Sequence, residues 1–183
     1  MNEHDQKIVD RIDRDVLGAL YEQYHDPIYR YCRHRLFTRE AAEDVTSGVF
    51  IAMVDNVGKF HGVPHSELKR WLYAVATKKA AEYVRNTKRR KELLSAAAVS
   101  GLLGSRSRAS NDGHPDWPNV FKAIQSLKSH EQAVVTLRFM EGMGMEDIAT
   151  ILGRRSVSVR VILSRAVRKM REKLIGTLSE MKV

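Results

Sequence analysis

The chain has 183 residues, of which 43% are hydrophobic, enough for one globular domain or two small ones. Its formal net charge of +9 at pH 7 favours an acidic partner, either nucleic acid or an anionic membrane surface. A single cysteine, Cys32, excludes an internal disulfide framework and a cysteine-cluster metal site. The sequence has no secretory signal pattern and no run of ~20 apolar residues, which predicts a cytoplasmic protein without membrane insertion.

Apolar residues recur at helical spacing along most of the chain, and no stretch alternates with the period of a strand, so the sequence predicts an all-α fold. Pro27 favours a helix start at Asp26 or Pro27, because its missing N–H would be unpaired in a first turn. Gly48 lies inside the next helical pattern, at a cost of ~1 kcal/mol relative to alanine. The first half is therefore expected to form helices at about 14–24, 27–36, 39–58 and 67–94.

Residues 95–116 differ in composition, being rich in serine, glycine and alanine and lacking aromatic residues. Such a composition is typical of a flexible linker or a loosely packed loop. The sequence therefore predicts two small helical domains, residues 1–94 and 117–183, joined by this linker.

Helical patterning resumes after the linker, at about 120–127, 129–140, 145–152 and 156–174. Ser129 and Gln132 have the spacing of a capping box. Ala149 and Gly153 have the spacing of a helix-turn-helix, because the crossing point of two helices admits only a small side chain and the turn needs a residue that tolerates positive φ. The C-terminal domain is therefore predicted to be a helix-turn-helix.

The last helix carries a basic face, formed by Arg160, Arg165, Arg168, Lys169 and Arg171 and preceded by Arg154 and Arg155. A helix of about 19 residues is ~28 Å long, enough to enter a major groove and meet phosphates further on. The plain alternative is a solvated basic face on an amphipathic helix. Combined with the helix-turn-helix spacing, the basic face predicts binding to duplex DNA.

The long helix predicted before the linker is a second basic segment, "LKRWLYAVATKKAAEYVRNTKRRK", with one acidic residue, Glu82. Aromatic side chains interleave its cations, a combination that grips single-stranded nucleic acid by stacking on bases and holding the backbone. The alternative is that these aromatic residues pack into the core. The sequence leaves both open for Trp71.

The order of these segments resembles the extracytoplasmic-function sigma factors of bacterial RNA polymerase. "LYEQYHDPIYRYCRHRLFTREAAEDVTSGVFIAM" is similar to the part of that family that binds the polymerase clamp. "KFHG" followed by "RWLYAVATKKAAEYVRNTKRR" is similar to the part that melts and reads the minus-ten element. "LKSHEQAVVTLRFMEGMGMEDIATILGRRSVSVRVILSRAVRKMREKL" resembles the domain that reads the minus-thirty-five element. The resemblance implies a sigma factor that directs core polymerase to promoters.

The resemblance also assigns residues. Those expected to bind polymerase are Glu43, Asp44, Val45 and Phe50. Those expected to bind the minus-ten element are His61, Lys69, Arg70, Trp71, Tyr73, Lys78, Tyr83 and Arg85. Those expected at the minus-thirty-five element are Arg154, Arg155, Ser156, Ser158, Arg160, Arg165 and Arg168. The implied partners are the clamp and flap regions of core polymerase, promoter DNA and an anti-sigma factor.

Three stretches depart from the family pattern. Ser47, Gly48 and Val49 stand where the family commonly has Gln-Glu-Thr, which predicts a clamp contact of different shape. Val161 and Ile162 replace a common Ser-Arg pair, which removes two polar candidates for base contacts. The loop between Phe60 and Trp71 is longer than usual, so we expect unusual recognition of a flipped base there.

Three other functions are alternatives to a sigma factor. A helix-turn-helix regulator that never contacts polymerase would use the last domain in the same way but would not need the first. Attachment to a membrane surface would use only the basic charge. An enzyme is disfavoured because Cys32 lies inside an apolar pattern, as a core residue does, and no catalytic, metal or cofactor motif stands out.

Overall fold

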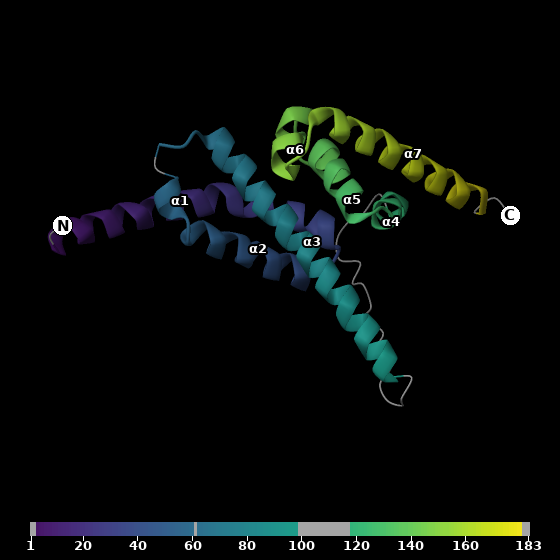
Figure 1. Cartoon of the computed structure of the whole chain (residues 1–183), viewed down its shortest axis with the longest axis horizontal. Coiled ribbons are helices and arrows are strands. Elements are labelled where there is room, and N and C mark those ends of the chain that lie inside the picture. The colour runs from purple at the N-terminus through teal and green to yellow at the C-terminus, as the bar shows by residue number, and fades with distance from the viewer. Residues whose placement is uncertain (1–2, 61, 99–117, 181–183) are drawn as a thin grey trace.

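The computed structural model describes residues 3–60, 62–98 and 118–180. Across these residues every regular element is helical, which confirms the predicted all-α fold (Figure 1). No helix among them is long and apolar enough to cross a membrane. The elements are α1 (Glu3–Leu36), α2 (Arg39–Val54), η1 (Val57–Lys59), α3 (His65–Ala98), α4 (Pro118–Gln125), α5 (Ser129–Val135), η2 (Thr136–Met140), α6 (Met145–Leu152) and α7 (Ser156–Glu180).

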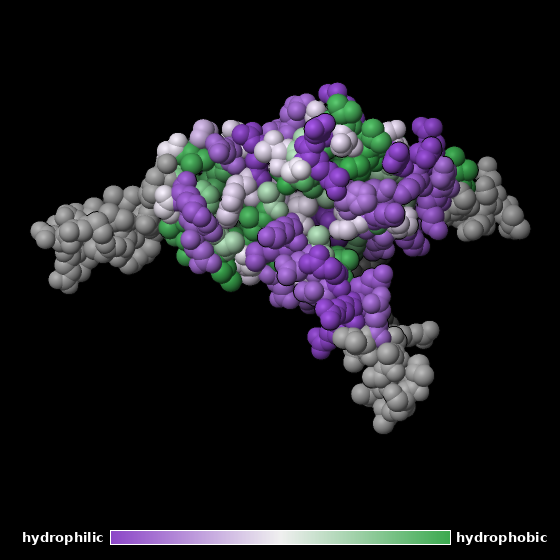
Figure 2. Space-filling view, in the orientation of Figure 1, coloured by the Kyte–Doolittle hydropathy of each residue, from purple (hydrophilic) through white to green (hydrophobic). Residues whose placement is uncertain are grey.

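Helices α1, α2 and α3 pack together and form the N-terminal module. Its core contains Ile28, Tyr31, Val49, Met53 and Leu72, each at most 1% exposed. The hydroxyl groups of Tyr31 and Thr77 lie 2.7 Å apart and join α1 to α3 inside this core. Beyond the core, α3 continues as a projecting arm covered with hydrophilic side chains (Figures 1 and 2).

The prediction of two helices before Leu36 is wrong, because α1 runs without a break through Pro27. A proline inside a helix removes one backbone hydrogen bond and costs ~3 kcal/mol or more. Tyr24 and Ile28, on either side of it, are only 6% and 0% exposed and belong to the same core. Burying a large apolar side chain contributes roughly 1.5–3 kcal/mol, so packing on both sides of Pro27 offsets the loss.

Other helix ends differ from the expected ones. Helix α2 ends at Val54, and the 3₁₀ turn η1 covers part of the remainder. Helix α3 begins at His65 and extends to Ala98, four residues past its predicted end. Helix α7 extends to Glu180, beyond the expected 174. The rest of the predicted linker lies outside the described residues.

The predicted capping box is displaced by one residue. Glu131, not Gln132, accepts a hydrogen bond from the backbone N–H before α5, that of Lys128, at 3.0 Å. Ser129 and Gln132 instead accept hydrogen bonds from Arg35 of α1, at 3.2 and 2.7 Å. The side chains that local spacing assigned to a cap therefore bind Arg35 of α1 instead.

Helices α4 to α7 form the C-terminal module, which packs against the N-terminal module. The largest buried cluster is continuous across both and joins Leu72 and Ala76 of α3 to Val134, Leu137 and Ile148. Arg35, 2% exposed, crosses this boundary through the two hydrogen bonds described above. In this structure the two modules therefore form one packed body.

Candidate nucleic-acid interface

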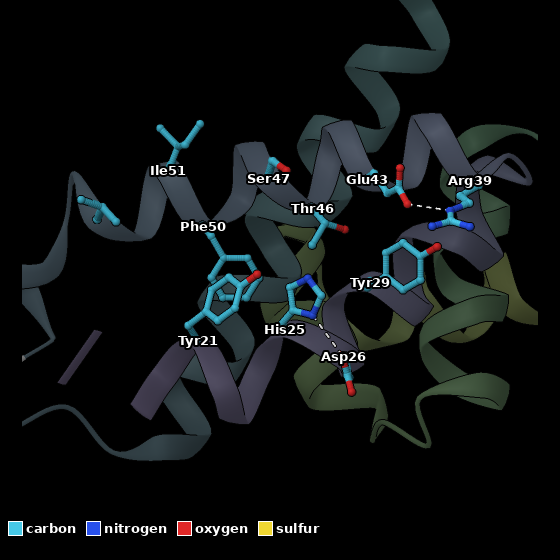
Figure 3. Close-up of a pocket in the computed structure, with 11 residues that line it drawn as sticks. Tyr21, His25, Asp26, Tyr29, Arg39, Glu43, Thr46, Ser47, Phe50 and Ile51 are labelled. Carbon is cyan, nitrogen blue, oxygen red and sulfur yellow. Dashed lines mark hydrogen bonds and ion pairs between the residues drawn. The ribbon is translucent and has the colours of Figure 1, made fainter. Parts of the chain in front are cut away.

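A groove of about 670 Å³ runs between α1 and α2 on the N-terminal module. Aromatic side chains spaced four residues apart on α1, Tyr21, His25 and Tyr29, form one wall, and Phe50 of α2 closes the floor (Figure 3). The rings of Tyr21 and Phe50 lie 4.8 Å apart, edge to face. The groove is thus a preformed aromatic surface on the protein exterior.

The outer edge of the groove is apolar and exposed. Ile51 and Val54 are 63% and 52% exposed, and Tyr21 is 47% exposed. At the opposite end, Arg39 donates a hydrogen bond to Glu43 at 2.7 Å (Figure 3). An exposed apolar surface bordered by charged residues is typical of a protein-binding site.

The four residues predicted to bind polymerase fall in different environments. Glu43 lines the groove, and Asp44 is exposed beside it on α2. Phe50 is buried yet lines the groove, so it supports the surface from below. Val45 is 5% exposed and belongs to the core, which leaves little of it for a partner. The aromatic residues of α1 were missed, although their regular spacing on one helical face was visible in the sequence.

Gly48 of α2 lies against the side chain of Lys79 of α3. A Cβ atom at this position would lie 3.3 Å from the Nζ atom of Lys79 on α3. The glycine therefore leaves room for the lysine chain to lie across α2. A side chain here would require the flexible end of Lys79 to shift slightly.

Helix α3 places most of its predicted DNA-binding residues on the surface. Lys69, Lys78 and Arg85 are exposed, and Tyr83 is half-buried. Trp71 is also half-buried, with its ring 4.9 Å from that of Phe60 in an edge-to-face contact. His61 lies outside the described residues. The structure thus gives Trp71 a packing partner while leaving part of it accessible.

Two acidic residues of the C-terminal module bind side chains near the start of α3. Asp147 of α6 accepts a hydrogen bond from Arg70 at 3.0 Å, and Glu141 accepts one from the Tyr73 hydroxyl at 2.7 Å. Tyr73 is 1% exposed, so this predicted DNA contact is not accessible in this arrangement. Burial and the hydrogen bond to Glu141 both raise the pKa of Tyr73, which keeps the phenol protonated as a donor. These two carboxylates were not singled out in the sequence, because neither belongs to a recognised motif.

The geometry of the helix-turn-helix agrees with the expected roles of its small residues. Ala149 is 5% exposed at the packed side of α6. Gly153 follows with φ of 59° and ψ of 40°, the left-handed conformation that a glycine adopts at least cost. The backbone N–H groups of Gly153 and Arg154 donate hydrogen bonds to the carbonyl of Ala149. These bonds end α6 and direct the chain toward the start of α7.

Helix α7 presents its predicted basic residues to solvent. Arg154, Arg155, Ser158, Arg160, Arg165 and Arg168 are all exposed, and Ser156 is half-buried at the start of the helix. Lys169 is different: it donates a hydrogen bond at 2.6 Å to Glu131, which is buried on α5. This contact fastens α7 to the module, although the Lys169 side chain stays 43% exposed.

The electrostatics of Glu131 follow from that contact. Burial works against ionisation of this carboxyl, but hydrogen bonds from Lys169 and from the backbone of Lys128 outweigh it and lower the pKa of Glu131. The carboxylate is therefore charged at neutral pH and pairs with the lysine. The ion pair adds to the apolar packing of α5 on α7.

Known family patterns match both modules in the same order. The pattern of Sigma-70 region 2 matches residues 20–90, and that of Sigma-70 region 4 matches residues 119–170. The chain belongs to the sigma-70 family. The first match covers the groove and most of α3, and the second covers the helix-turn-helix.

Curated relatives of this sigma-70 chain are named as sigma factors of RNA polymerase. The chain is 26% identical over 168 residues to the ECF RNA polymerase sigma factor BldN of Streptomyces coelicolor, covering 86% of this chain and 60% of BldN. It is 23% identical to the RNA polymerase sigma factor YlaC of Bacillus subtilis, over 93% of this chain and 98% of YlaC. It is 27% identical to the ECF RNA polymerase sigma-E factor of Haemophilus influenzae, over 95% and 96% of the two chains.

Two solved structures share the fold. The sigma factor RpoE of Bartonella quintana, solved with the anti-sigma factor NepR, matches with a TM-score of 0.64 over 86% of this chain and 95% of RpoE, at 17% identity. CnrH, solved with the cytosolic domain of CnrY, matches with a TM-score of 0.59 over 91% of this chain and 90% of CnrH, at 19% identity. The similarity extends through both modules of the sigma-70 chain.

Proposed function

We propose that this sigma-70 chain binds core RNA polymerase and directs it to specific promoters, with the residue roles given below. The observation that carries this proposal is the presence on one chain of an aromatic groove, a basic aromatic helix and a helix-turn-helix, in the order of regions 2 and 4. A regulator acting through DNA alone would need only the last of these.

The α1–α2 groove is the proposed binding site for the polymerase clamp. Its apolar edge, Ile51 and Val54, offers area to bury, and the aromatic wall provides rigid contact surface. The exposed carboxylates Glu43 and Asp44 suit a basic partner and affect partner choice and association rate more than affinity.

The two basic surfaces are proposed to hold the promoter at two places. The exposed arginines of α7 bind duplex DNA of the minus-thirty-five element, largely through phosphates. Helix α3 holds the opened strand of the minus-ten element, with Trp71 and Tyr83 as stacking side chains. The first surface is open in this structure, whereas the second is partly covered.

Use of the α3 surface requires the modules to separate. Arg70 is paired with Asp147, and Tyr73 is buried against Glu141. We expect polymerase binding to supply the free energy for this separation by engaging each module at a different place. An anti-sigma factor, such as the NepR bound to RpoE, would favour a state in which polymerase is excluded.

The test is specific transcription by purified core polymerase with and without the chain, with start sites mapped. Ile51→Glu should abolish transcription, because it places a charge at the apolar edge of the groove, while duplex DNA binding by the free chain is retained. Ile175→Glu is the matched control, since Ile175 is 57% exposed at the far end of α7. Polymerase-independent binding to one DNA sequence, with no change in transcription by core enzyme, would favour the simple regulator instead.

Trp71→Ala separates DNA opening from DNA binding. If Trp71 stacks on an opened strand, the variant should form closed complexes and fail to make thymines reactive to permanganate. Phe60→Leu, which removes the ring that Trp71 packs against, is the comparison for folding. Equal loss of thermal stability in both variants, with no separate defect in opening, would assign Trp71 to packing alone.

We expect the chain to have no catalytic activity of its own and to act in the cytoplasm, where polymerase and DNA are found. Burial raises the pKa of the Cys32 thiol to about 11, so it is not a nucleophile at neutral pH. Nucleotide or ester turnover by the purified chain, lost on Cys32→Ala, would contradict this expectation.

A further inference from the structure

The outward face of α7 has an apolar centre. Val157 and Val161 are 66% and 44% exposed, although valine is ordinarily buried. Successive residues of an α-helix are rotated by about 100°, so Val157 points ~180° away from the buried Ala166 and only ~40° away from Val161. The two valines therefore form an apolar strip in the first two turns of α7, opposite the side that packs on the module.

Cations flank this strip on both sides. At the same rotation per residue, Arg160 lies ~60° to one side of Val157 and Arg165 ~80° to the other. Both arginines are exposed, and no acidic residue lies in the first turn of α7. Glu146 of α6 lies 4.0 Å from Arg160, but its side chain is 79% exposed, so the pair is weak and yields to a stronger anion.

Duplex DNA has the complementary arrangement. In a helix-turn-helix complex the first turns of the second helix face the base edges, while the sides of that helix face the two phosphate backbones. Along the major-groove edge, the one apolar group is the C5 methyl of thymine. An apolar centre between arginine flanks matches this surface, whereas a protein partner would match it only by placing carboxylates on both sides of an apolar group.

We propose that Val157 and Val161 are specificity-determining residues that recognise thymine methyl groups in the upstream promoter element. This inference rests on the proposed function, because it assigns α7 to the major groove. It also reverses an expectation from the sequence: Val161, which removes a polar candidate for base contact, is itself a base-reading residue. Its partner in the strip, Val157, had no assigned role.

The experiment uses the full chain assembled with bacterial core polymerase and a pool of random duplexes. One pool is made with thymidine and a second with deoxyuridine throughout, which removes only the C5 methyl. In the thymidine pool we expect an upstream block with at least one preferred thymine, and in the deoxyuridine pool a weakened preference at that position. Replacing that single thymine by uracil in one duplex should weaken binding ~4-fold, the effect of losing one buried methyl-sized contact.

Val157→Ala and Val161→Ala identify the side chain that reads the methyl. Both sites are exposed and alanine favours the helix, so these variants should fold. In the variant that lacks the contacting valine, the thymine-to-uracil change should alter affinity less than ~1.5-fold, a non-additive result that measures a direct contact. Ile175→Ala, ~21 Å further along α7 than Val161, should keep the full uracil effect.

The outcomes separate the two proposals. The same upstream preferences in both pools, or an equal uracil effect in wild type and both valine variants, would overturn the role of the valines and leave the sigma function intact. No enriched sequence in either pool, together with no transcription start, would overturn the sigma function and with it this inference.

Discussion

The two basic surfaces of this chain differ in how they relate to the rest of the molecule. Helix α7 presents its arginines to solvent, packs on the module through the buried Val159 and Ala166, and is joined to α5 by the hydrogen bond from Lys169 to Glu131. The start of α3 is covered, with Arg70 and Tyr73 held by carboxylates of the other module. Similar composition therefore does not imply similar availability: one surface is open to solvent, and the other must first lose an internal partner.

The open surface gives the largest expected effect. Arg160→Ala combined with Arg165→Ala should weaken duplex binding by the holoenzyme roughly 10-fold or more and lower the slope of log affinity against log salt by ~2, since each lost phosphate contact contributes ~0.9. Filter binding or fluorescence anisotropy across a salt series measures both. An unchanged slope would show that this face of α7 does not meet phosphates.

The covered surface is tested by loosening its contact. Tyr73→Phe removes the hydroxyl bonded to Glu141 and should shift the modules toward separation by about tenfold, because a hydrogen bond to a charged acceptor contributes roughly 1.5 kcal/mol at the lower end of its usual range. Fluorescence energy transfer between labels on the two modules reports the separation.

Tyr31→Phe is the matched control for this experiment. It deletes a hydroxyl whose partner, Thr77, lies in the same module, so it should lower stability without moving the modules apart. If both variants separate the modules equally, the contact between Tyr73 and Glu141 does not hold the covered state.

A smaller effect is expected within the C-terminal module at Glu131. Glu131→Gln should lower the free energy of unfolding at neutral pH by about 1 kcal/mol, because Lys169 loses its charged partner. The folded-state pKa of Glu131 is lowered, so its contribution is complete above the usual carboxyl value of 4.5 and is lost as pH falls through the lower folded value.

Urea unfolding of wild type and Glu131→Gln at several pH values measures this difference, and the two curves should converge in acid. Glu172→Gln is the control, since that carboxylate is 69% exposed and lies 3.9 Å from Arg168. A difference that persists below the folded pKa would mean that shape, and not charge, explains the effect.

The smallest effect is expected at the rim of the groove. Arg39→Ala should change stability by only ~0.3–0.5 kcal/mol, because the pair with Glu43 is exposed and spans one helical turn. Its effect on association with core polymerase should be larger at low salt than at high salt, measured by stopped-flow mixing. A loss of stability well above this range would show that the pair supports the fold of α2.

Local patterns in the sequence were sufficient to predict many of the helices and the turn at Gly153. Helical periodicity identified α2, α3, α6 and α7, because each has an apolar face that must be buried. Gly153 was assigned correctly, because a left-handed turn residue is a backbone requirement that few residue types meet. The surface arginines of α7 were found for a similar reason: a cluster of cations at helical spacing needs solvent or an anion.

Contacts between residues far apart in the sequence explain the predictions that were wrong. Pro27 indicated a helix start, but the core on both sides of it holds α1 in one piece. Ser129 and Gln132 had cap spacing, but Arg35, about a hundred residues earlier, takes both as acceptors. The groove residues on α1 were overlooked because aromatic spacing alone does not tell a core face from a binding face.

The sequence by itself determined that this chain is helical, basic and built around a helix-turn-helix, since periodicity, charge and turn chemistry are local properties. Only the tertiary structure decided that Tyr73 is buried, that Lys169 serves packing and that Val157 and Val161 lie at the centre of an open face. Burial and pairing depend on which helix faces meet. That is decided by many small free-energy contributions from residues far apart in the sequence, which no single segment reveals.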